Sequence, residues 1–394
     1  MKKVGIISFY YKNRNIGGLL QAYAVQKLIA EYGLEAEQIC YDNSVNNDAS
    51  LAYAKARKSS LVKSSDIQTL LRKGKRYIKR VLKIKSIDKE LQTATRVQNV
   101  LFDEFASVIP HSSKIYNINN IHETESIYDI FLCGSDQVWN TGFLAQSAYY
   151  LSFTSKPKIA FAVSMGKAKI NKTEKEYLLK QIGSFDAISV REETLKELIE
   201  SISDISCTRV LDPTLLISPQ EWKRIENDSS LPKGKYIFCY FLGDCTWQRK
   251  EVTRFAKESE LDILDIPYIT GERRKSDKYL SGTHSYNIGP REFIAAIENA
   301  EYVFTDSFHA VVFSLLFNKQ FYVFDRDGQS GSASLNSRII GLLDMVGCAD
   351  RRIVSTSINS QLIDYKSVNR KLEEEITKSK DWLDKQLCKN KEED

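Results

Sequence analysis

Short apolar runs alternate with helical periodicity along this chain. Residues 4–9 form an apolar run of the length of a buried strand, and 35–41 form a second one. Between them a helix is indicated by apolar side chains at helical spacing, namely Leu19, Leu20, Tyr23, Ala24 and Leu28. Gly33 stands where a glycine often ends a helix. The strand–helix–strand order predicts a parallel sheet covered by helices.

The same pattern continues and then restarts after Trp222. Further strands are predicted at 128–133, 158–163, 186–190, 236–242, 261–266, 302–305 and 321–324, and further helices at 290–299, 310–317 and 368–383. We therefore predict a first α/β domain over 1–215, with a helical insertion at about 50–110. A second α/β domain follows over 216–355, and a helical segment over 356–394, with the junction near residues 213–219.

Composition narrows the class of protein. The chain has 394 residues, of which 42% are hydrophobic and 27% charged, which is typical of a globular protein and not of a disordered one. The N-terminus shows no signal-peptide pattern, and no apolar run approaches the roughly 18 residues of a membrane span. The seven cysteines form no Cys-x-x-Cys pair, so we expect neither a disulfide scaffold nor a metal site, and we expect a cytoplasmic location.

The net charge of +5 is unevenly distributed. Residues 55–85 hold twelve Lys or Arg and one acid, a local charge of +11, so the remainder carries −6. Nucleic-acid binding is not expected, because basic and aromatic residues do not interleave elsewhere. The basic segment predicts an amphipathic helix, which either makes peripheral contact with an anionic membrane or packs on the first domain.

Ligands of parallel sheets bind beyond the carboxyl ends of the strands, so polar residues there are candidates. After the first strand, Asn15 and Gly17 precede or open a helix, either as an anion-binding turn or as a tight connection. After the strand at 128–133 come Ser135, Asp136 and Gln137. This group would contact a polar ligand, or form a polar turn beside a buried Trp139.

Three further segments carry cationic or titratable side chains. Arg191 ends the strand at 186–190, where it would bind a carboxylate or phosphate, or pair with a neighbouring glutamate. Ser307, Phe308 and His309 follow the strand at 302–305 and lead into a helix. The helix N-terminus favours anions, and an imidazole suits proton transfer near neutral pH. Arg338, in Asn-Ser-Arg at a predicted helix start, would be a second anion clamp or face solvent.

These motifs, in this order, resemble the polysaccharide pyruvyl transferase family. The residues that carry the resemblance, from Gly5 to about Arg352, are 15–18 with 20–24, 134–139, 189–192, 211–215, 305–309 and 336–338. The resemblance implies a GT-B-like pair of Rossmann-like domains. It further implies an enzyme that transfers the enolpyruvyl group of phosphoenolpyruvate to two hydroxyls of a sugar, as a pyruvate ketal, in surface polysaccharide biosynthesis such as that of capsule or exopolysaccharide.

The resemblance also implies roles for individual residues. Arg191 matches the family's donor-binding arginine after a first-domain strand, and His309 matches the histidine of its Arg-x-His triplet. Ser307 stands where that triplet has arginine, and we expect Arg338 to supply the missing charge. His309 and Asp136 are the expected acid and base, in either assignment, with phosphoenolpyruvate as donor and no cofactor.

Other partners and functions remain open from the sequence. The acceptor is expected to be a sugar, and one carried on a polyprenyl diphosphate would be met at the inner face of the membrane. Two other functions fit the same pattern of domains, since a fold does not determine an activity. They are a GT-B glycosyltransferase that uses a nucleotide sugar, and a glycan-binding module without catalysis.

Overall fold

The computed structural model describes residues 2–45, 52–53, 55–56, 89–141, 147–166, 170–267, 274–326, 333–354, 358 and 361–389. The predicted basic helix of the insertion lies outside these residues, except for 55–56. The described part of the insertion includes the helix α4, Lys89–Ser107.

A six-stranded parallel sheet forms the first domain, in the order β2-β1-β3-β4-β5-β6. Its strands are β1 Lys3–Ile7, β2 Glu35–Gln38, β3 Ile130–Asp136, β4 Lys158–Val163, β5 Ala187–Val190 and β6 Thr208–Arg209. Helices α1 Ile16–Glu31, α5 Lys172–Ile182 and α6 Glu193–Ile202 connect strands of this sheet, and two 3-10 turns are at Ile121–Ser126 and Ser147–Tyr150. Because β1, β3 and β4 are buried over nearly their whole length, they read as continuous apolar runs.

The second domain repeats this architecture with the order β12-β11-β10-β7-β8-β9, again all parallel. Its strands are β7 Tyr236–Tyr240, β8 Asp262–Asp265, β9 Thr283–His284, β10 Tyr302–Thr305, β11 Gln320–Phe324 and β12 Arg352–Ile353. Its helices are α9 Thr246–Glu258, α10 Pro290–Glu298, α11 Phe308–Leu316 and α12 Ala333–Val346, with 3-10 turns at Asp277–Tyr279 and Ala349–Arg351. The sequence does not predict β6, β9 and β12, because each is two residues long.

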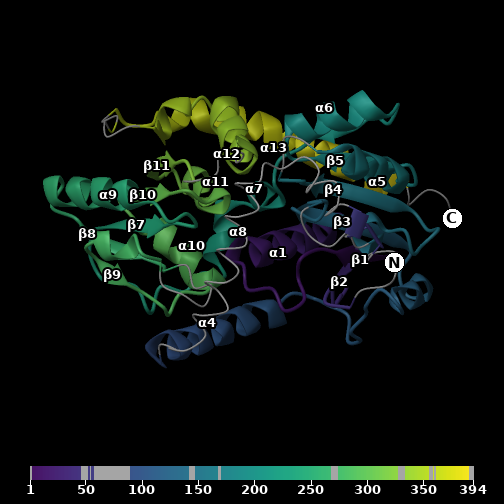
Figure 1. The fold of residues 1–394 in the computed structure, drawn as a ribbon, viewed down its shortest axis with the longest axis horizontal. Helices are drawn as coiled ribbons and strands as arrows, with labels where there is room; N and C mark the ends of the chain where they lie inside the picture. Colours follow the sequence, from purple (N-terminus) through teal and green to yellow (C-terminus); the bar gives the residue numbers. More distant parts are fainter. Residues whose placement is uncertain are drawn as a thin grey trace.

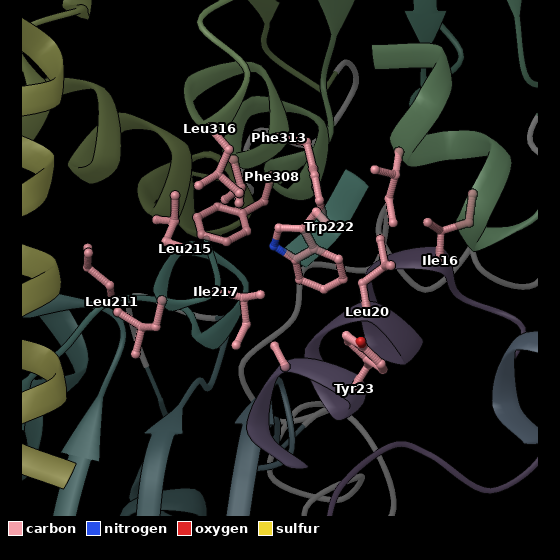
Figure 2. Close-up of a cluster of buried hydrophobic side chains, with 14 of the residues drawn as sticks. Ile16, Leu20, Tyr23, Leu211, Leu215, Ile217, Trp222, Phe308, Phe313 and Leu316 are labelled. Atoms are coloured by element: carbon pink, nitrogen blue, oxygen red, sulfur yellow. The ribbon is translucent and has the colours of Figure 1, made fainter. Parts of the chain in front are cut away.

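An apolar core joins the two domains. Between the sheets run the short helices α7 Pro213–Leu216 and α8 Pro219–Lys223, where the junction is predicted (Figure 1). Figure 2 shows Trp222 between α1 and α11, and its indole lies 5.4 Å from the Tyr23 ring and 5.0 Å from the Phe313 ring. The Trp222 Nε1 donates to Thr214 O at 3.1 Å. This packing makes one continuous hydrophobic cluster of the facing sides of both domains.

The last helix, α13 Tyr365–Lys389, spans both domains along one side of the molecule (Figure 1). At its start the Tyr365 hydroxyl donates to Ser314 O of α11 at 3.3 Å. In its second half, Ser379 Oγ accepts from Leu211 N at 3.0 Å, and Trp382 stacks on Phe161 of β4 with 6.1 Å between the ring centres. The predicted C-terminal helix is therefore confirmed, and it ties the second domain back to the first.

Candidate active site

A cavity of about 890 Å³ opens where the two sheets present their carboxyl ends to each other. In each sheet the strand order reverses, between β1 and β3 in the first and between β7 and β10 in the second. At such a reversal the loops after two neighbouring strands turn to opposite faces of the sheet, and a crevice forms between them. Ligands of open α/β sheets bind in this crevice. The loops after all four of these strands supply lining residues, so the cavity joins both crevices.

A buried ion cluster forms one side of this cavity. Arg191, at the end of β5, donates through Nη1 to Asp212 and through Nη2 to Asp136 Oδ1, the latter at 3.2 Å. The Arg191 side chain is 3% exposed, and that of Asp212 is fully buried. A buried charge without a partner costs several kcal/mol, so neither aspartate can move away from Arg191 without a large loss of free energy. Arg191 therefore holds both carboxylates in fixed positions. The alternative in which Arg191 pairs with Glu192 or Glu193 is not seen among the described residues, since its ion pairs are with Asp136 and Asp212.

Arg338 reaches the same cluster from the second domain. Its Nη1 lies 3.9 Å from Asp136 Oδ1, and its Nε lies 3.9 Å from Glu192 Oε1. The guanidinium carbons of Arg191 and Arg338 lie 5.3 and 5.5 Å from the centre of the Phe308 ring, so this ring contacts both cations. The cluster therefore contains side chains from β3, from the segments that follow β5 and β6, and from α11 and α12.

His309, in the first turn of α11, packs against the first turn of α1. A Cβ atom placed on Gly17 would lie 2.0 Å from His309 Nδ1, so only glycine leaves room for the imidazole. On its other side the ring points Nε2 toward Asp212 Oδ2 at 3.8 Å. This Nε2 is buried and makes no hydrogen bond, as is also true of Arg338 Nε and Glu192 Oε2. Unsatisfied buried polar atoms in one place are a sign of a site built for a ligand.

The charges in the cluster shift one another's proton affinities. Burial raises the pKa of Asp136, but Arg191, His309 and Arg338 outweigh it and hold that pKa below its usual value. For Asp212, burial again opposes Arg191 and His309, and the pKa falls to about 2. Burial lowers the pKa of His309, with Arg191 and Arg338 acting in the same direction and both carboxylates against it. Burial and Arg191 lower the pKa of Arg338 to about 10. Near neutral pH both aspartates are ionised and the imidazole is neutral.

The other candidate residues divide between the cavity and its support. Asn15, Gly17, Gln137, Ser307 and Phe308 line the cavity together with Asp136, His309 and Arg338. Asn15 Oδ1 also accepts from Gly18 N at 3.0 Å, which caps α1.

Two of the candidate residues lie outside the cavity lining. Ser135 is fully buried and is not among the residues that line the cavity; its Oγ lies 3.5 Å from Asp212 Oδ2. Arg191 likewise lies behind Asp136 and Asp212 and is absent from the lining. The packing around a strand end decides which of its residues reaches the surface, and spacing along the chain does not show it.

The local structure around Arg338 also differs from the prediction. The helix α12 begins at Ala333, so Ser337 and Arg338 lie inside it, and Ser337 is not its N-cap. Arg338 is buried, so it does not face solvent. Trp139 is fully buried, stacking on Tyr150 at 5.3 Å, which confirms its predicted place in the core.

Two residues of the site escape sequence reasoning. Asp212 lies in the segment 211–215, which is one of those that carry the family resemblance. The neighbouring sequence does not indicate that its side chain faces Arg191 and His309, which come from other elements. Arg326 lines the cavity and donates from Nε to Asp306 O at 3.2 Å. It follows β11, and the rule that polar residues just after strands are candidates would have found it.

Two kinds of feature are absent from the part of the chain that the structure describes. No group of three or more His, Cys, Asp or Glu side chains within them is arranged to hold a metal ion. Across the same residues, no helix has both the length and the apolar character needed to cross a membrane.

Comparison with known proteins identifies the family. The family model described as polysaccharide pyruvyl transferase matches residues 15–328, which is most of the chain and includes all of the cavity-lining residues discussed above except Arg338. The chain belongs to this family. No curated protein matches it.

Solved structures that are similar to this chain have low sequence identity to it. The UDP-GlcNAc 2-epimerase from Neisseria meningitidis bound to UDP-GlcNAc has a TM-score of 0.50 and 11% identity, over 99% of this chain and 100% of that one. A putative UDP-N-acetylglucosamine 2-epimerase from Listeria monocytogenes has a TM-score of 0.45 and 11% identity, over 94% of each chain. The glycotransferase of kitacinnamycin has a TM-score of 0.46 and 13% identity, over 98% of each chain. The likeness to the Neisseria enzyme, together with the two parallel sheets, confirms the predicted GT-B-like fold of two Rossmann-like domains and shows the fold alone.

Proposed function

We propose that this member of the polysaccharide pyruvyl transferase family transfers the enolpyruvyl group of phosphoenolpyruvate to two hydroxyls of a sugar, forming a pyruvate ketal in surface polysaccharide biosynthesis. The observation that carries the proposal is the meeting of Asp136, His309 and Arg338 at one cavity, from three elements in two domains. It combines a carboxylate, an imidazole and a guanidinium, which are the groups that this reaction needs.

The donor's phosphate and carboxylate would bind at the second-domain side of the cavity. Arg326 and Arg338 both line it there, and α11 presents its N-terminus at the same place. Guanidinium groups bind such anions through paired hydrogen bonds, and a helix N-terminus adds a favourable dipole. Arg338 thus takes over the charge that Ser307 does not provide, and Arg191 holds Asp136 in place from behind.

Acid and base roles follow from the charges in the cluster. The low pKa of Asp136 keeps it ionised, so it serves as the base that takes a proton from a sugar hydroxyl. His309 is then the acid, and it acts in its protonated form. We propose that it donates its proton to the methylene carbon of the donor.

The steps balance without another reactant. A proton from His309 adds to the methylene carbon, which leaves positive charge on the carbon that bears the phosphate oxygen. A sugar hydroxyl attacks that carbon and loses its proton to Asp136. The bond to phosphate then breaks, and the leaving phosphate takes the proton from Asp136. The second hydroxyl attacks the same carbon and loses its proton to the neutral imidazole of His309, which closes the ketal ring and leaves hydrogen phosphate, with both side chains restored. The scheme uses no metal or redox cofactor.

The acceptor sugar would occupy the first-domain half of the cavity. Phe9, Tyr11, Asp42 and Asn43 are among its lining residues there. The Phe9 ring is braced edge-on by Tyr149 at 5.1 Å, and Asn43 Nδ2 donates to the Tyr149 hydroxyl at 3.1 Å. Aromatic faces with amide and carboxylate groups beside them suit a sugar ring, which has both apolar faces and hydroxyl edges.

We further propose that the acceptor is presented on a polyprenyl diphosphate at the inner face of the membrane, with the basic segment 55–85 in contact with anionic lipid. Sedimentation with phosphatidylglycerol vesicles at low and high salt tests this part alone. Binding that is lost at high salt is expected. Equal behaviour with neutral phosphatidylcholine vesicles would rule it out.

The reaction itself is tested by incubating the purified protein with phosphoenolpyruvate and a panel of lipid-linked oligosaccharides. The expected result is phosphate release that requires an acceptor, whose mass rises by that of pyruvate less one water. Binding of a glycan with no phosphate release from any member of the panel would favour a non-catalytic module. Transfer from a nucleotide sugar would favour a glycosyltransferase.

A further inference from the structure

The carboxylate of Asp212 is held rigidly between the two domains. It caps α7, and its Oδ1 accepts from Thr214 N at 3.0 Å and from Thr214 Oγ1 at 2.5 Å. Its Oδ2 accepts from Arg191 and lies 3.5 Å from Ser135 Oγ. With both oxygens anchored and the side chain fully buried, Asp212 has one conformation available.

The same Oδ2 faces the imidazole of His309 across the domain boundary, 3.8 Å from Nε2. That distance is too long for a hydrogen bond, and Nε2 has no other partner. Contacts of this kind often shorten when a ligand is bound. The charged groups that act on His309 are Asp212 and Asp136 from the first domain's strand ends, Arg191 from β5 and Arg338 from α12.

We propose that Asp212 is the buried counter-ion of His309, and that binding of an anion in the cavity places a proton on this imidazole. In the free protein burial and the two arginines outweigh the two aspartates at the ring, so the imidazole is neutral. A phosphate or carboxylate group beside Arg338 adds negative charge, and a proton from solvent then converts the imidazole to an imidazolium. Asp212 stays ionised and accepts the hydrogen on Nε2, in the manner of the aspartate in a catalytic triad.

This arrangement also identifies the nitrogen that delivers the proton. Because Nε2–H would be held by Asp212, the proton available to a substrate is the one on Nδ1, next to Gly17, which also lines the cavity. Asp212 is thus a positioning residue and not itself in contact with the substrate. Its use in catalysis rests on the function proposed above, whereas the proton uptake does not require turnover.

The chain has four histidines, so the proposal can be tested on the full protein by NMR with ring-labelled histidine. His309→Gln identifies the signal of His309. In the wild type we expect its titration midpoint below the usual value of about 6.5, and saturating inorganic phosphate should raise it by about one pH unit or more. A midpoint that phosphate leaves unchanged would overturn the proposal, without any need for a variant at Asp212.

Asp212→Asn removes the charge and keeps a capping oxygen for α7. In this variant the His309 midpoint should fall by about one pH unit or more, and phosphate should no longer restore it to the wild-type value. Asp350→Asn, at a partly exposed ion pair with Arg351, is the control and should leave the His309 titration as in the wild type. If Asp212→Asn titrates like the wild type, the counter-ion role is wrong. If the titrations follow the proposal but phosphoenolpyruvate is never consumed, the proposed function is wrong, and the role of Asp212 as counter-ion of His309 is still supported.

Discussion

Gly17 and His309 come from different domains, and a single methyl group at position 17 would stand 2.0 Å from the imidazole. The first turn of α1 can therefore pack against the first turn of α11 only because residue 17 has no side chain. This contact fixes where the imidazole lies in the cavity, between α1 on its Nδ1 side and Asp212 on its Nε2 side.

Gly17→Ala should therefore impair activity more than stability. The added methyl displaces His309, and misplacing a reacting group by about 1 Å can cost about a hundredfold in rate. We expect kcat to fall by about that factor, with phosphate release as the assay. Gly183→Ala is the matched control, since a Cβ there meets nothing within 4 Å, and it should retain full activity. Equal activities of the two variants would mean that His309 is not where the chemistry occurs.

Arg338→Ala should weaken donor binding in particular. A hydrogen bond to a charged group contributes about 1.5–3 kcal/mol, so the KM for phosphoenolpyruvate should rise about ten- to a hundredfold. Arg338→Lys should recover little of this, because a lysine lacks the planar fork. Arg224→Ala, at a side chain that is 71% exposed, provides the control. An unchanged KM in Arg338→Ala would exclude this arginine as the replacement for the missing one.

Phe9→Ala should affect the acceptor and leave the donor alone. Losing an aromatic contact of about 0.5–1.5 kcal/mol should raise the KM for the acceptor about two- to tenfold, with the KM for phosphoenolpyruvate unchanged. Tyr279→Ala, at an exposed tyrosine in the second domain, is the control for a lost surface aromatic. A change in both KM values would show that Phe9 shapes the whole cavity and not the acceptor half alone.

Asp212 should make stability depend on pH in the acid range. Its pKa is about 2 in the folded protein against an ordinary 3.8, so the folded state favours the carboxylate. This pKa difference contributes about 2 kcal/mol to the free energy of unfolding. The contribution is complete above pH 3.8 and is lost as pH falls through about 2. Urea unfolding of wild type and Asp212→Asn should thus give free energies that converge as pH falls from 5 toward 2. A gap that stays constant over this range would show that Asp212 is not selectively ionised by folding.

The core around Trp222 predicts that the two domains unfold together. Trp222→Ala removes a fully buried ring from the junction and should cost about 3–5 kcal/mol, and Trp222→Phe, which keeps a ring but loses the bond to Thr214 O, should cost less. Calorimetry of the wild type should show one transition. Two separate transitions, with only one of them shifted by Trp222→Ala, would contradict a shared core.

The sequence predicts the fold better than the site because strands of a parallel sheet leave a local signal. The strands β1, β3, β4, β7, β10 and β11 each contain a buried run of mostly apolar residues, so each can be recognised without its neighbours. The predicted strands at 158–163 and 302–305 have the observed bounds. The others differ from the observed strands by up to three residues at an end, as for 128–133 against Ile130–Asp136. Strands of two residues leave too few positions for a pattern.

The site depends on contacts between residues far apart in the chain. Placing candidates after strands finds Asp136 and His309, because the carboxyl ends of parallel strands share one edge. It does not show that Arg191 turns away to hold Asp136, that Ser135 lies beneath Asp212, or that Arg338 enters from the middle of α12. Those positions follow from how the two domains pack, and the motifs do not encode that packing locally.

The most direct test is whether the cavity recognises phosphoenolpyruvate as its donor. Thermal unfolding of the wild type and of Arg338→Ala should be followed with increasing phosphoenolpyruvate and, separately, UDP-N-acetylglucosamine. Since a ligand of the folded state raises the unfolding temperature, phosphoenolpyruvate should raise that of the wild type and have little effect on the variant, while the nucleotide sugar should change neither. Stabilisation by the nucleotide sugar with none by phosphoenolpyruvate would contradict the account.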